Sequence, residues 1–534
     1  MKLIKDASGQ KLRGGFYTPE RIAHFMLKWA LNGRENADIL EPSCGDGVFL
    51  EQLGNNSFNY NSITGIELDI IEARKSKDLN IKNSEVINSD FHTFCNSTNK
   101  RFDIVIGNPP YIRYQYFDKK QQDEAEKIFK KVNIKYSKLT NAWVSFVIGS
   151  CLLLKEQGKI GFVLPAELLQ VSYAKPLRNF LAHFFHKINI ISFKKLVFPD
   201  IQQEVVLLLC EKNGIDKHLI EHIEVTDIDE LEKIDLNLLK TPKKEIDFEE
   251  NKWTFYFLEQ DEVDLIEKIK HSNLVPKIKK YADVEVGITT GANDYFSVSN
   301  EIVKDFSLNE FAKPLIGRSI QANSLIFTEE DWYKNNKSNI KSNLLVFKEK
   351  KEIKNKKVLD YIKLGEEKGI NKGYKCKIRD EWQIIPSIKL SNALFTRRNN
   401  LFPKLIENLA EAYTTDTMHR VFIKENVNKR SFIASFYNSL SFAFSEIVGR
   451  SYGGGVLELM PSEVGDILLP YNESNSELLD TLDIMIREKR NIEEILDYSD
   501  NIILKKGYGF TDKEIKTFRR IWKRLSGRRL GRKN

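Results

Sequence analysis

The chain has 534 residues, more than one ordinary hydrophobic core holds, so two or three domains are expected. Hydrophobic residues make up 41% and charged residues 29%, as in a globular protein, and no apolar run of about 18 residues suggests a membrane span. The start of the chain lacks the apolar core of a signal peptide. The five cysteines are scattered and form no CxxC pair, which argues against a zinc site or a disulfide framework and favours a reducing cytoplasm.

The net charge of +7 is concentrated at the C-terminus. Residues 505–534 hold 12 Lys and Arg against Asp512 and Glu514, a charge of +10, which leaves −3 for the rest of the chain. A basic tail on a nearly neutral body suggests contact with a polyanion. The alternative is a basic tail that is merely solvated.

Strands and helices alternate between residues 16 and 210, which predicts a parallel, doubly wound α/β sheet. Helical stretches are expected at 143–154 and 173–185. Strands are expected at 38–41, 62–67, 84–88, 102–106, 159–164, 188–193 and 204–210. Ligands of such a sheet bind at the carboxyl ends of the strands.

The composition and the apolar patterning of the sequence change twice after this region. We expect a first domain over 1–215, a charged linker with short helices over 216–250 and a second domain over 251–504. Residues 505–534 are expected to form a basic C-terminal helix or tail, because the apolar residues from Phe510 to Leu525 recur at helical spacing.

A short glycine loop, Glu41 to Gly47, follows the first strand. Glycine allows a tight turn and close approach of a ligand, but the loop has no phosphate-binding lysine, and its acids Glu41 and Asp46 would repel phosphate. The loop therefore suits a nucleoside that carries a cation, such as S-adenosylmethionine. Ser43, Cys44 and Gly45 are the expected contacts.

Acids also end the second and third strands. Glu67, followed by Leu68, can accept the hydroxyls of a ribose, and Asp90, followed by Phe91, can accept a proton of an adenine amino group. The alternative for each acid is a strand-end cap or a solvated carboxylate. Their placement at successive strand ends favours a cofactor site.

Asn108-Pro109-Pro110-Tyr111 closes the fourth strand. Two prolines cannot continue a sheet, so the chain leaves it in a fixed, extended shape. The Asn108 side-chain oxygen and the Pro109 carbonyl can accept hydrogen bonds from the exocyclic amine of adenine, while Tyr111 stacks on the base. A base within a duplex cannot reach such a turn and must be flipped out. No metal is required.

Residues 16–210 resemble the gamma-class, TaqI-like N6-adenine DNA methyltransferases of bacterial restriction–modification systems. The resemblance implies a mixed seven-stranded Rossmann-like methyltransferase sheet and a C-terminal α+β target-recognition domain. Glu41 to Gly47 resembles the family's glycine loop and Asn108 to Tyr111 its catalytic motif. The remaining implied residues are Tyr17 and Thr18 at the cofactor's methionine end, Phe146 against its adenine, Asn108 and Pro110 bordering it, and Phe198 as a second aromatic on the flipped base, for which core packing is the alternative.

In the resembled family the C-terminal half reads DNA. Base-edge and phosphate contacts need polar and cationic side chains, which the second half supplies. The candidates are Thr289, Thr290, Asn293, Arg318, Arg397, Arg398, Arg450, Tyr452, Arg519, Arg520, Lys523 and Arg524. The Asn-Pro-Pro-Tyr motif also occurs in glutamine methyltransferases acting on release factors, and RNA adenine methyltransferases are relatives, so RNA or protein substrates stay open.

The expected partner is double-stranded DNA, read by a cytoplasmic, nucleoid-associated monomer with no membrane contact. A cognate restriction endonuclease, encoded as a separate protein, is the expected functional partner. A non-catalytic DNA-binding subunit with the same fold is a further alternative, and the intact motif residues argue against it.

Overall fold

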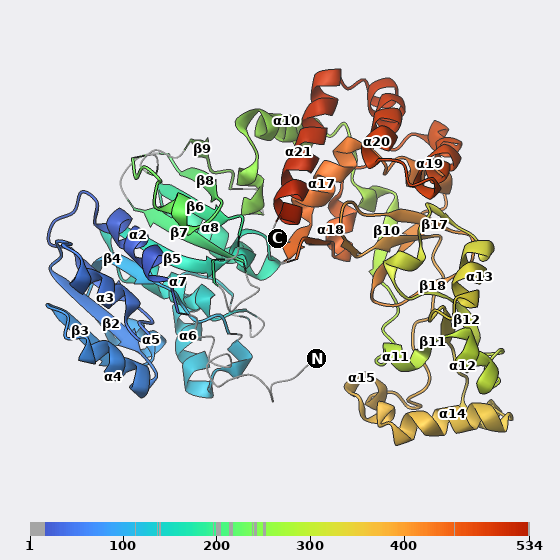
Figure 1. Ribbon diagram of the computed structural model, residues 1–534, viewed down its shortest axis with the longest axis horizontal. Helices are drawn as coiled ribbons and strands as arrows, with labels where there is room; N and C mark the ends of the chain where they lie inside the picture. Colours follow the sequence, from blue (N-terminus) through green and yellow to red (C-terminus); the bar gives the residue numbers. More distant parts are fainter. Residues whose placement is uncertain are drawn as a thin grey trace. The chain divides into compact units, whose positions relative to one another are not determined.

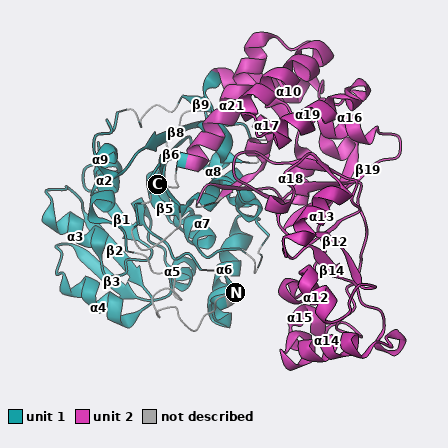
Figure 2. Cartoon of the chain, turned by 45° about the vertical axis from the view of Figure 1, so that its right-hand side comes forward, with its two compact units in different colours: residues 1–260, 531–534 teal, residues 261–530 magenta. Residues whose placement is uncertain are grey.

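The computed structural model describes residues 17–531 except 113, 136, 138–139, 196, 199–203, 213–216, 238, 240–242, 249–251 and 453. The chain divides into two compact units, one of residues 1–260 with 531–534 and one of residues 261–530 (Figure 2). Each unit has its own core and is described separately.

Unit 1 is built on a nine-stranded sheet in the order β3-β2-β1-β4-β5-β7-β6-β8-β9 (Figure 1). Its strands are β1 (Asp38–Glu41), β2 (Ser62–Glu67), β3 (Ser84–Asn88), β4 (Phe102–Gly107), β5 (Leu154–Pro165), β6 (Lys187–Phe193), β7 (Val205–Glu211), β8 (Leu219–Val225) and β9 (Lys244–Glu245). The strands from β3 to β5 are parallel, and β7 runs antiparallel to both β5 and β6, so the sheet is mixed.

The expectation of seven strands was wrong, because β8 and β9 extend the sheet beyond β6. β8 pairs in parallel with β6 along its whole length, and β9 pairs antiparallel with β8. Both strands lie in the stretch expected to be a linker, which instead belongs to unit 1. Among the described residues, β9 pairs only with Leu219 and Ile220 of β8, and β8 carries the partly exposed polar side chains of Glu221, His222 and Glu224, so its sequence lacks the continuous apolar run of a fully buried strand.

Helices connect the strands of unit 1 at the positions that a doubly wound fold requires. They are α2 (Glu20–Leu31), α3 (Val48–Asn55), α4 (Ile70–Asp78), α5 (Phe91–Ser97), α6 (Lys119–Lys131), α7 (Trp143–Leu152), α8 (Lys175–Phe184) and α9 (Ile228–Leu231). α7 is buried on nearly all sides, consistent with its apolar sequence, while α2 and α8 bury one face.

Unit 2 combines three small sheets with helices. The sheets have the orders β10-β19-β15-β17-β13, β11-β14-β12-β18 and β16-β21-β20. Their strands are β10 (Ala282–Val286), β11 (Ser297–Val298), β12 (Ala312–Ile316), β13 (Ile326–Phe327), β14 (Asn343–Leu345), β15 (Ala393–Thr396), β16 (Arg398–Asn399), β17 (Leu405–Asn408), β18 (Tyr413–Thr414), β19 (Met418–Ile423), β20 (Arg450–Tyr452) and β21 (Val456–Glu458).

The helices of unit 2 are distributed over both halves of its sequence. They are α10 (Gln260–Ser272), α11 (Asn293–Phe296), α12 (Asn300–Asp305), α13 (Glu329–Lys337), α14 (Lys356–Glu367), α15 (Tyr374–Lys377), α16 (Lys429–Ala434), α17 (Ser439–Val448), α18 (Pro461–Asp466), α19 (Leu478–Arg487), α20 (Ile492–Asp500) and α21 (Asp512–Leu530). A π-helical turn, Asn501–Lys506, continues α20.

The basic C-terminal segment is an integrated helix of unit 2 and not a separate tail. α21 runs to Leu530 and buries Phe518, Ile521 and Trp522. The helical spacing therefore predicted the helix correctly, and its apolar face is covered by the rest of the unit. In the described part of the chain, no helix has the length and apolar character needed to cross a bilayer.

Candidate cofactor and catalytic site

The glycine loop after β1 is held against α4. Gly47 has φ +95° and precedes α3, and a Cβ at this position would stand 2.7 Å from Leu79 Cδ1 and 3.0 Å from Ser76 Oγ. The Ser76 hydroxyl also donates a hydrogen bond of 2.7 Å to the Gly45 carbonyl. A left-handed backbone and this close approach together require glycine at position 47.

Glu67 at the end of β2 holds the other side of the loop. Its carboxylate accepts the Gly45 N–H at 2.9 Å through Oε2 and the Asp69 N–H at 2.8 Å through Oε1. Burial raises the pKa of Glu67, while these backbone N–H groups act in the opposite direction. Each carboxylate oxygen has a second lone pair, so Glu67 can still accept the hydroxyls of a ribose.

Glu41, at the end of β1, is a buried acid with an unsatisfied oxygen. The residue is 1% exposed, and its Oε2 atom has no hydrogen-bond partner among the described residues. Burial, reinforced by the charges of Asp46 and Glu67, raises the pKa of Glu41 well above its ordinary value. An ionised carboxylate without partners is costly in the ligand-free protein, and a cation that binds beside it favours the ionised form.

The Asn108-Pro109-Pro110-Tyr111 turn is tied to its surroundings on two sides. The Ser43 hydroxyl donates to the Asn108 carbonyl at 3.1 Å, which connects the turn to the glycine loop. The Tyr111 hydroxyl donates to the Val163 carbonyl of β5 at 3.0 Å. Pro109 is buried, and the Asn108 Oδ1 atom is shielded from solvent. The turn is thus fixed next to the loop expected to hold the cofactor.

Asp90 caps α5 and is bound to a buried histidine. Its Oδ2 accepts the Thr93 N–H at 2.8 Å, and its Oδ1 lies 3.2 Å from His92 Nδ1. His92 Nε2 lies 2.7 Å from Ser145 Oγ of α7. Burial acts to raise the pKa of Asp90, but the contacts with His92 and Thr93 outweigh it and lower that pKa. Asp90 is therefore held as an ionised acceptor.

His92 was not singled out from the sequence. Ser145 has a single hydroxyl hydrogen, and its Oγ also lies 2.9 Å from the Ala142 carbonyl. His92 connects Asp90 of the β3 end with Ser145 of α7. The sequence gives no sign that His92 connects Asp90 with Ser145, because Ser145 lies 53 residues further along the chain.

The aromatic residues expected beside the cofactor adenine lie together. The Phe91 and Phe146 rings stack with centroids 4.9 Å apart, and the His92 ring meets Phe146 edge-on, also at 4.9 Å. α5 and α7 thereby form one apolar wall. Leu68, just after Glu67, is 58% exposed.

The remaining residues expected around the cofactor and target base lie in different surroundings. Thr18 is buried, whereas Tyr17 is 45% exposed and its hydroxyl donates to Glu72 Oε2 at 3.3 Å. Phe198 is 4% exposed and belongs to the hydrophobic core of unit 1, as the core-packing alternative predicts. Contact of Phe198 with a flipped base stays a prediction that requires the ring to become accessible. Phe16 and Pro199, which flank these motifs, lie outside the described residues.

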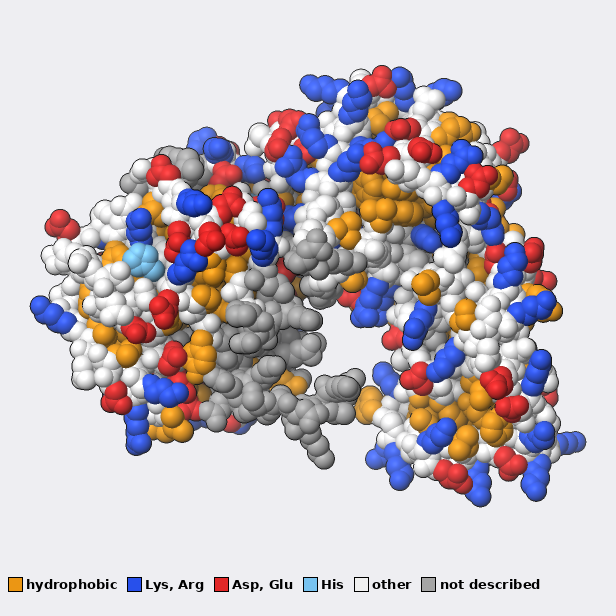
Figure 3. Space-filling view, in the orientation of Figure 1, with side chains coloured by type: hydrophobic (Ala, Val, Ile, Leu, Met, Phe, Trp, Pro, Cys, Tyr) orange, Lys and Arg blue, Asp and Glu red, His pale blue; other side chains and the backbone are white. Residues whose placement is uncertain are grey.

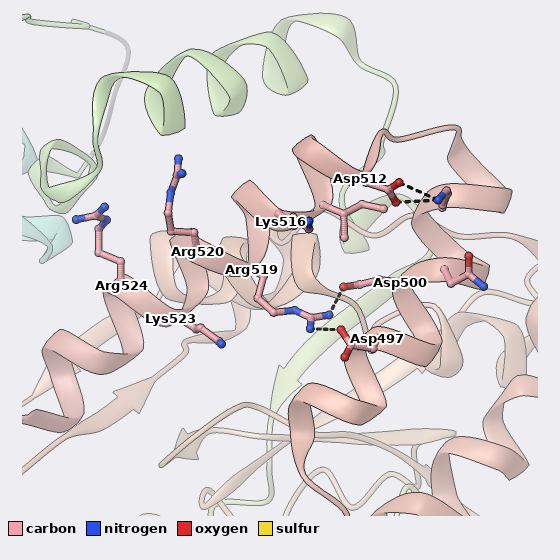
Figure 4. A pocket seen from close by; sticks show the side chains of 11 residues that line it. Asp497, Asp500, Asp512, Lys516, Arg519, Arg520, Lys523 and Arg524 are labelled. Carbon is pink, nitrogen blue, oxygen red and sulfur yellow. Dashed lines mark hydrogen bonds and ion pairs between the residues drawn. The ribbon is translucent and has the colours of Figure 1, made fainter.

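The cations of α21, expected to contact DNA, are neutralised within unit 2. Arg519 points to Asp497 and Asp500, with 2.6 Å between its Nη2 and Asp500 Oδ2 (Figure 4). The other expected DNA contacts on this helix are paired in the same way: Arg520 with Asp261 and Glu262, Arg524 with Glu262, and Lys523 with Glu493. The amino-acid sequence showed only the cluster of basic residues. The acids that pair with them come from α10 and α20.

Arg529 near the end of α21 is the most deeply buried of these cations. Its side chain is 1% exposed and pairs with Glu446 of α17 at 2.6 Å, and it also donates to the Gly455 carbonyl at 2.6 Å. These contacts fasten α21 to α17 and to the loop before β21. DNA contact by Arg519, Arg520, Lys523 and Arg524 stays a prediction, and each of these cations is paired with an acid of the same unit.

Other residues expected to read DNA are divided between exposed and paired positions. Thr289 and Arg318 are exposed, Thr290 is buried, and Asn293 donates to Asp416 Oδ1 at 2.9 Å. Arg397 and Arg398 both pair with Glu458, and Arg450 pairs with Glu463. Tyr452 lies in β20, and its side chain is outside the described set.

Two family models match the chain. Residues 30–198 match the Eco57I restriction-modification methylase, and residues 250–504 match the C-terminal domain of the Type II methyltransferase M.Eco57I. These two matches support a bacterial restriction–modification DNA methyltransferase, and the gamma class is consistent with them.

Individual relatives agree with the family assignment. The chain is 26% identical to the Type II methyltransferase M.AccI of Acinetobacter calcoaceticus, over 92% of this chain and 93% of that protein. It is 32% identical to M.HincII of Haemophilus influenzae over 42% of this chain and 41% of the relative. The fold resembles the Type IIL restriction-modification enzyme MmeI, solved in complex with DNA, with a TM-score of 0.59 at 12% identity, covering 95% of this chain and 75% of that one.

S-adenosyl-L-methionine is the cofactor of this methyltransferase, and the residues of unit 1 fit it. Glu41 supplies a buried, unsatisfied carboxyl beside the position for a cationic amino-acid end. Glu67 and Asp90 supply acceptors at successive strand ends, and Phe91 and Phe146 an apolar wall. When bound, the cofactor supplies an electrophilic methyl group. In the described part of the chain, no group of His, Cys, Asp or Glu side chains could hold a metal ion.

Proposed function

We propose that the enzyme transfers a methyl group from S-adenosyl-L-methionine to N6 of an adenine flipped out of duplex DNA at a specific sequence. The observation that carries this proposal is the hydrogen bond from the Ser43 hydroxyl to the Asn108 carbonyl. It ties the cofactor loop to the Asn-Pro-Pro-Tyr turn, so that the electrophile and the amine acceptors stand next to each other.

Asn108 and Pro109 act by accepting hydrogen bonds. The adenine amine is a poor nucleophile because its lone pair is delocalised into the ring. Acceptance of its two N–H hydrogens by the Asn108 side-chain oxygen and the Pro109 carbonyl favours a more pyramidal nitrogen, whose lone pair is directed at the methyl carbon. Catalysis then rests on positioning and electrostatics, and water accepts the displaced proton afterwards.

Tyr111 holds the base by stacking. Its hydroxyl is bound to the Val163 carbonyl, so the ring is oriented before the base arrives and little conformational entropy is lost on stacking. Phe198 is the proposed second aromatic. Its location in the core means that its contact with the base requires a local rearrangement around the segment that carries it.

Unit 2 is proposed to read the target sequence, as a target-recognition domain, in a monomeric enzyme. The resulting methylation protects the DNA of the host cell from a cognate endonuclease carried by a separate protein. The binding of this protein to DNA, and not to RNA or a release factor, is supported by the family match of residues 250–504.

The proposal is tested with radiolabelled S-adenosyl-L-methionine and three substrates: duplex DNA, tRNA and a protein extract. We expect label in DNA alone, recovered as N6-methyladenine after digestion to nucleosides. Sequencing of DNA from cells expressing the protein should then map the modified adenines to one sequence motif. Label in cytosine, in RNA or in a glutamine side chain would overturn the proposal.

A further inference from the structure

Unit 2 carries a group of lysines whose charge is not neutralised by the fold. Lys368, Lys372, Lys375 and Lys377 lie between the end of α14 and the end of α15, and all four are exposed. In the described part of the chain none of them has a carboxylate within ion-pair distance. This differs from α21, where neighbouring acids pair with most of the cations.

Acids near these lysines are few or already engaged. Glu381 accepts the Lys350 N–H at 2.9 Å, and Glu366 pairs with the side chain of Lys350. Residues 368–379 contain no acidic residue, and Asp380 follows directly. Figure 3 shows Lys and Arg side chains along the lower edge of the lobe that contains α14 and α15 in Figure 1. The segment therefore presents a positive surface.

Large apolar side chains are exposed among the same lysines. Tyr374 is 75% exposed and Ile378 is 64% exposed, and the Lys375 ammonium lies 5.9 Å from the centre of the Tyr374 ring. Exposed aromatic and apolar groups of this size among free cations are typical of a surface that binds nucleic acid. A merely solvated face would not require them.

The segment is rigidly attached to the loop that holds three of the expected base-reading residues. Cys376 is fully buried and anchors α15 in the core. Arg379 donates through Nη2 to the Thr290 carbonyl at 2.6 Å. Gly291 has φ +83°, and a Cβ there would stand 2.8 Å from Lys375 Cβ. The loop from Thr289 to Asn293 and α15 therefore form one surface within unit 2.

We propose that Lys372, Lys375 and Lys377 bind the sugar–phosphate backbone of the DNA substrate, with Tyr374 packing against it. This inference rests on the proposed function only in that duplex DNA is the substrate. Phosphate contacts carry no sequence information but fix register, so this surface would position the Thr289–Asn293 loop on the duplex.

The test compares two triple variants of the full-length enzyme. Lys372→Ala/Lys375→Ala/Lys377→Ala removes three unpaired cations. The control, Lys268→Ala/Lys334→Ala/Lys348→Ala, removes three exposed lysines of unit 2 that pair with Glu514, Glu330 and Glu310, and therefore changes the net charge equally. DNA affinity is measured by fluorescence anisotropy at several salt concentrations, with cofactor affinity measured by calorimetry.

We expect the first variant to bind DNA of every sequence more weakly. The slope of log K against log salt concentration, which is negative, should become smaller in magnitude by about 3, or about 0.9 per phosphate contact. The control should keep the wild-type slope, and both should bind the cofactor normally. Tyr374→Ala should weaken DNA binding without changing the slope. An unchanged slope in the first variant would overturn the inference.

A second test uses the wild-type enzyme, so its result does not depend on whether the variants fold. Lysine acetylation followed by mass spectrometry should show that duplex DNA protects Lys372, Lys375 and Lys377, while Lys334 and Lys348 stay reactive. Equal reactivity with and without DNA would contradict the inference. The methylated base is identified separately in the same preparation. A result that contradicts N6-adenine methylation can therefore be distinguished from a result that contradicts DNA binding by these lysines.

Discussion

Buried acidic and basic groups are paired differently at the strand ends of unit 1 and on helix α21 of unit 2. At the end of β1, Glu41 is buried with an oxygen that has no partner in the described part of the chain. On α21, Arg529 is just as deeply buried but is matched by Glu446. Unsatisfied burial is tolerated where a ligand completes the site, and matched burial holds elements together. A charged residue therefore indicates function only once its partners are known.

The largest effect is expected for the matched charge. Arg529→Met leaves Glu446 buried without its cation and should lower the free energy of unfolding by about 3–5 kcal/mol. Denaturant unfolding measures this, and Arg529→Met/Glu446→Met should recover much of the loss. If the single variant is as stable as the parent, the pair does not fasten α21.

Deletion of residues 510–534 would not be a clean test of DNA contact by α21. The structure shows that the deletion would remove Phe518, Ile521 and Trp522 from the interior of unit 2, so it would test folding and not DNA contact.

The next largest effect concerns turnover. Asn108→Ala removes a hydrogen-bond acceptor from the amine and should lower kcat on the order of 10²–10³-fold, with near-normal cofactor affinity. Radiolabel transfer and calorimetry measure the two quantities. Asn96→Ala is the matched control, because the side-chain hydrogen bonds of Asn96 found in the described part of the chain join it to Glu124 and Lys131 and not to residues of the turn. Retained turnover in Asn108→Ala would contradict the assigned role.

Glu41→Gln tests whether the buried acid of unit 1 serves the cofactor, because it should lower cofactor affinity without lowering the stability of the ligand-free protein. The amide keeps the shape but loses the charge, so cofactor affinity should fall by about 1.5–3 kcal/mol, or on the order of 10–100-fold. The ligand-free protein should not be destabilised at neutral pH, because the variant no longer buries an acid whose ionised form is disfavoured.

The pH dependence of the same residue has a definite sign. Burial raises the pKa of Glu41 in the folded state, so the folded protein binds its proton more tightly than the unfolded chain does. Stability of the ligand-free enzyme should therefore fall as pH rises from the ordinary glutamate value towards the raised one. Thermal melts over this range should show the decline in the parent and a smaller one in Glu41→Gln, and parallel profiles would refute it.

The smallest effects concern Tyr111. Tyr111→Ala should weaken capture of the flipped base by about 1–3 kcal/mol, since the stacking surface is lost. Tyr111→Phe keeps the ring and loses the hydrogen bond to the Val163 carbonyl, which contributes about 0.5–1.5 kcal/mol of stability. Fluorescence of a base analogue at the target position distinguishes the two, and unchanged flipping in the alanine variant would exclude a stacking role.

The expected bounds of β1, β2 and β3 agree with the structure, and β4 differs by one residue. β1, β2 and β4 are largely buried, whereas β3 lies at the edge of the sheet and buries only Val86 of its residues. β8 was missed because its sequence mixes polar and apolar residues in the same way as an irregular segment. Position near the edge of the sheet therefore does not by itself decide whether a strand can be predicted from the sequence.

The sequence indicated candidate site residues most directly where they follow strands. Glu41, Glu67 and Asp90 occupy strand ends, and any parallel sheet brings such ends together. His92 and Ser145 were missed, because their contact depends on how α5 packs against α7. The lysines of α15 form a dense run in the sequence, and an acid-free stretch containing an aromatic residue is the signal that was overlooked.

The sequence alone determined the methyltransferase sheet, the glycine loop and the Asn-Pro-Pro-Tyr turn, because each depends on local chemistry: proline stiffness, glycine freedom and the burial of apolar runs. Only the tertiary structure decided which charges remain available. Ion pairs join residues far apart in the chain, such as Arg520 and Glu262, and their formation depends on packing that no local pattern encodes.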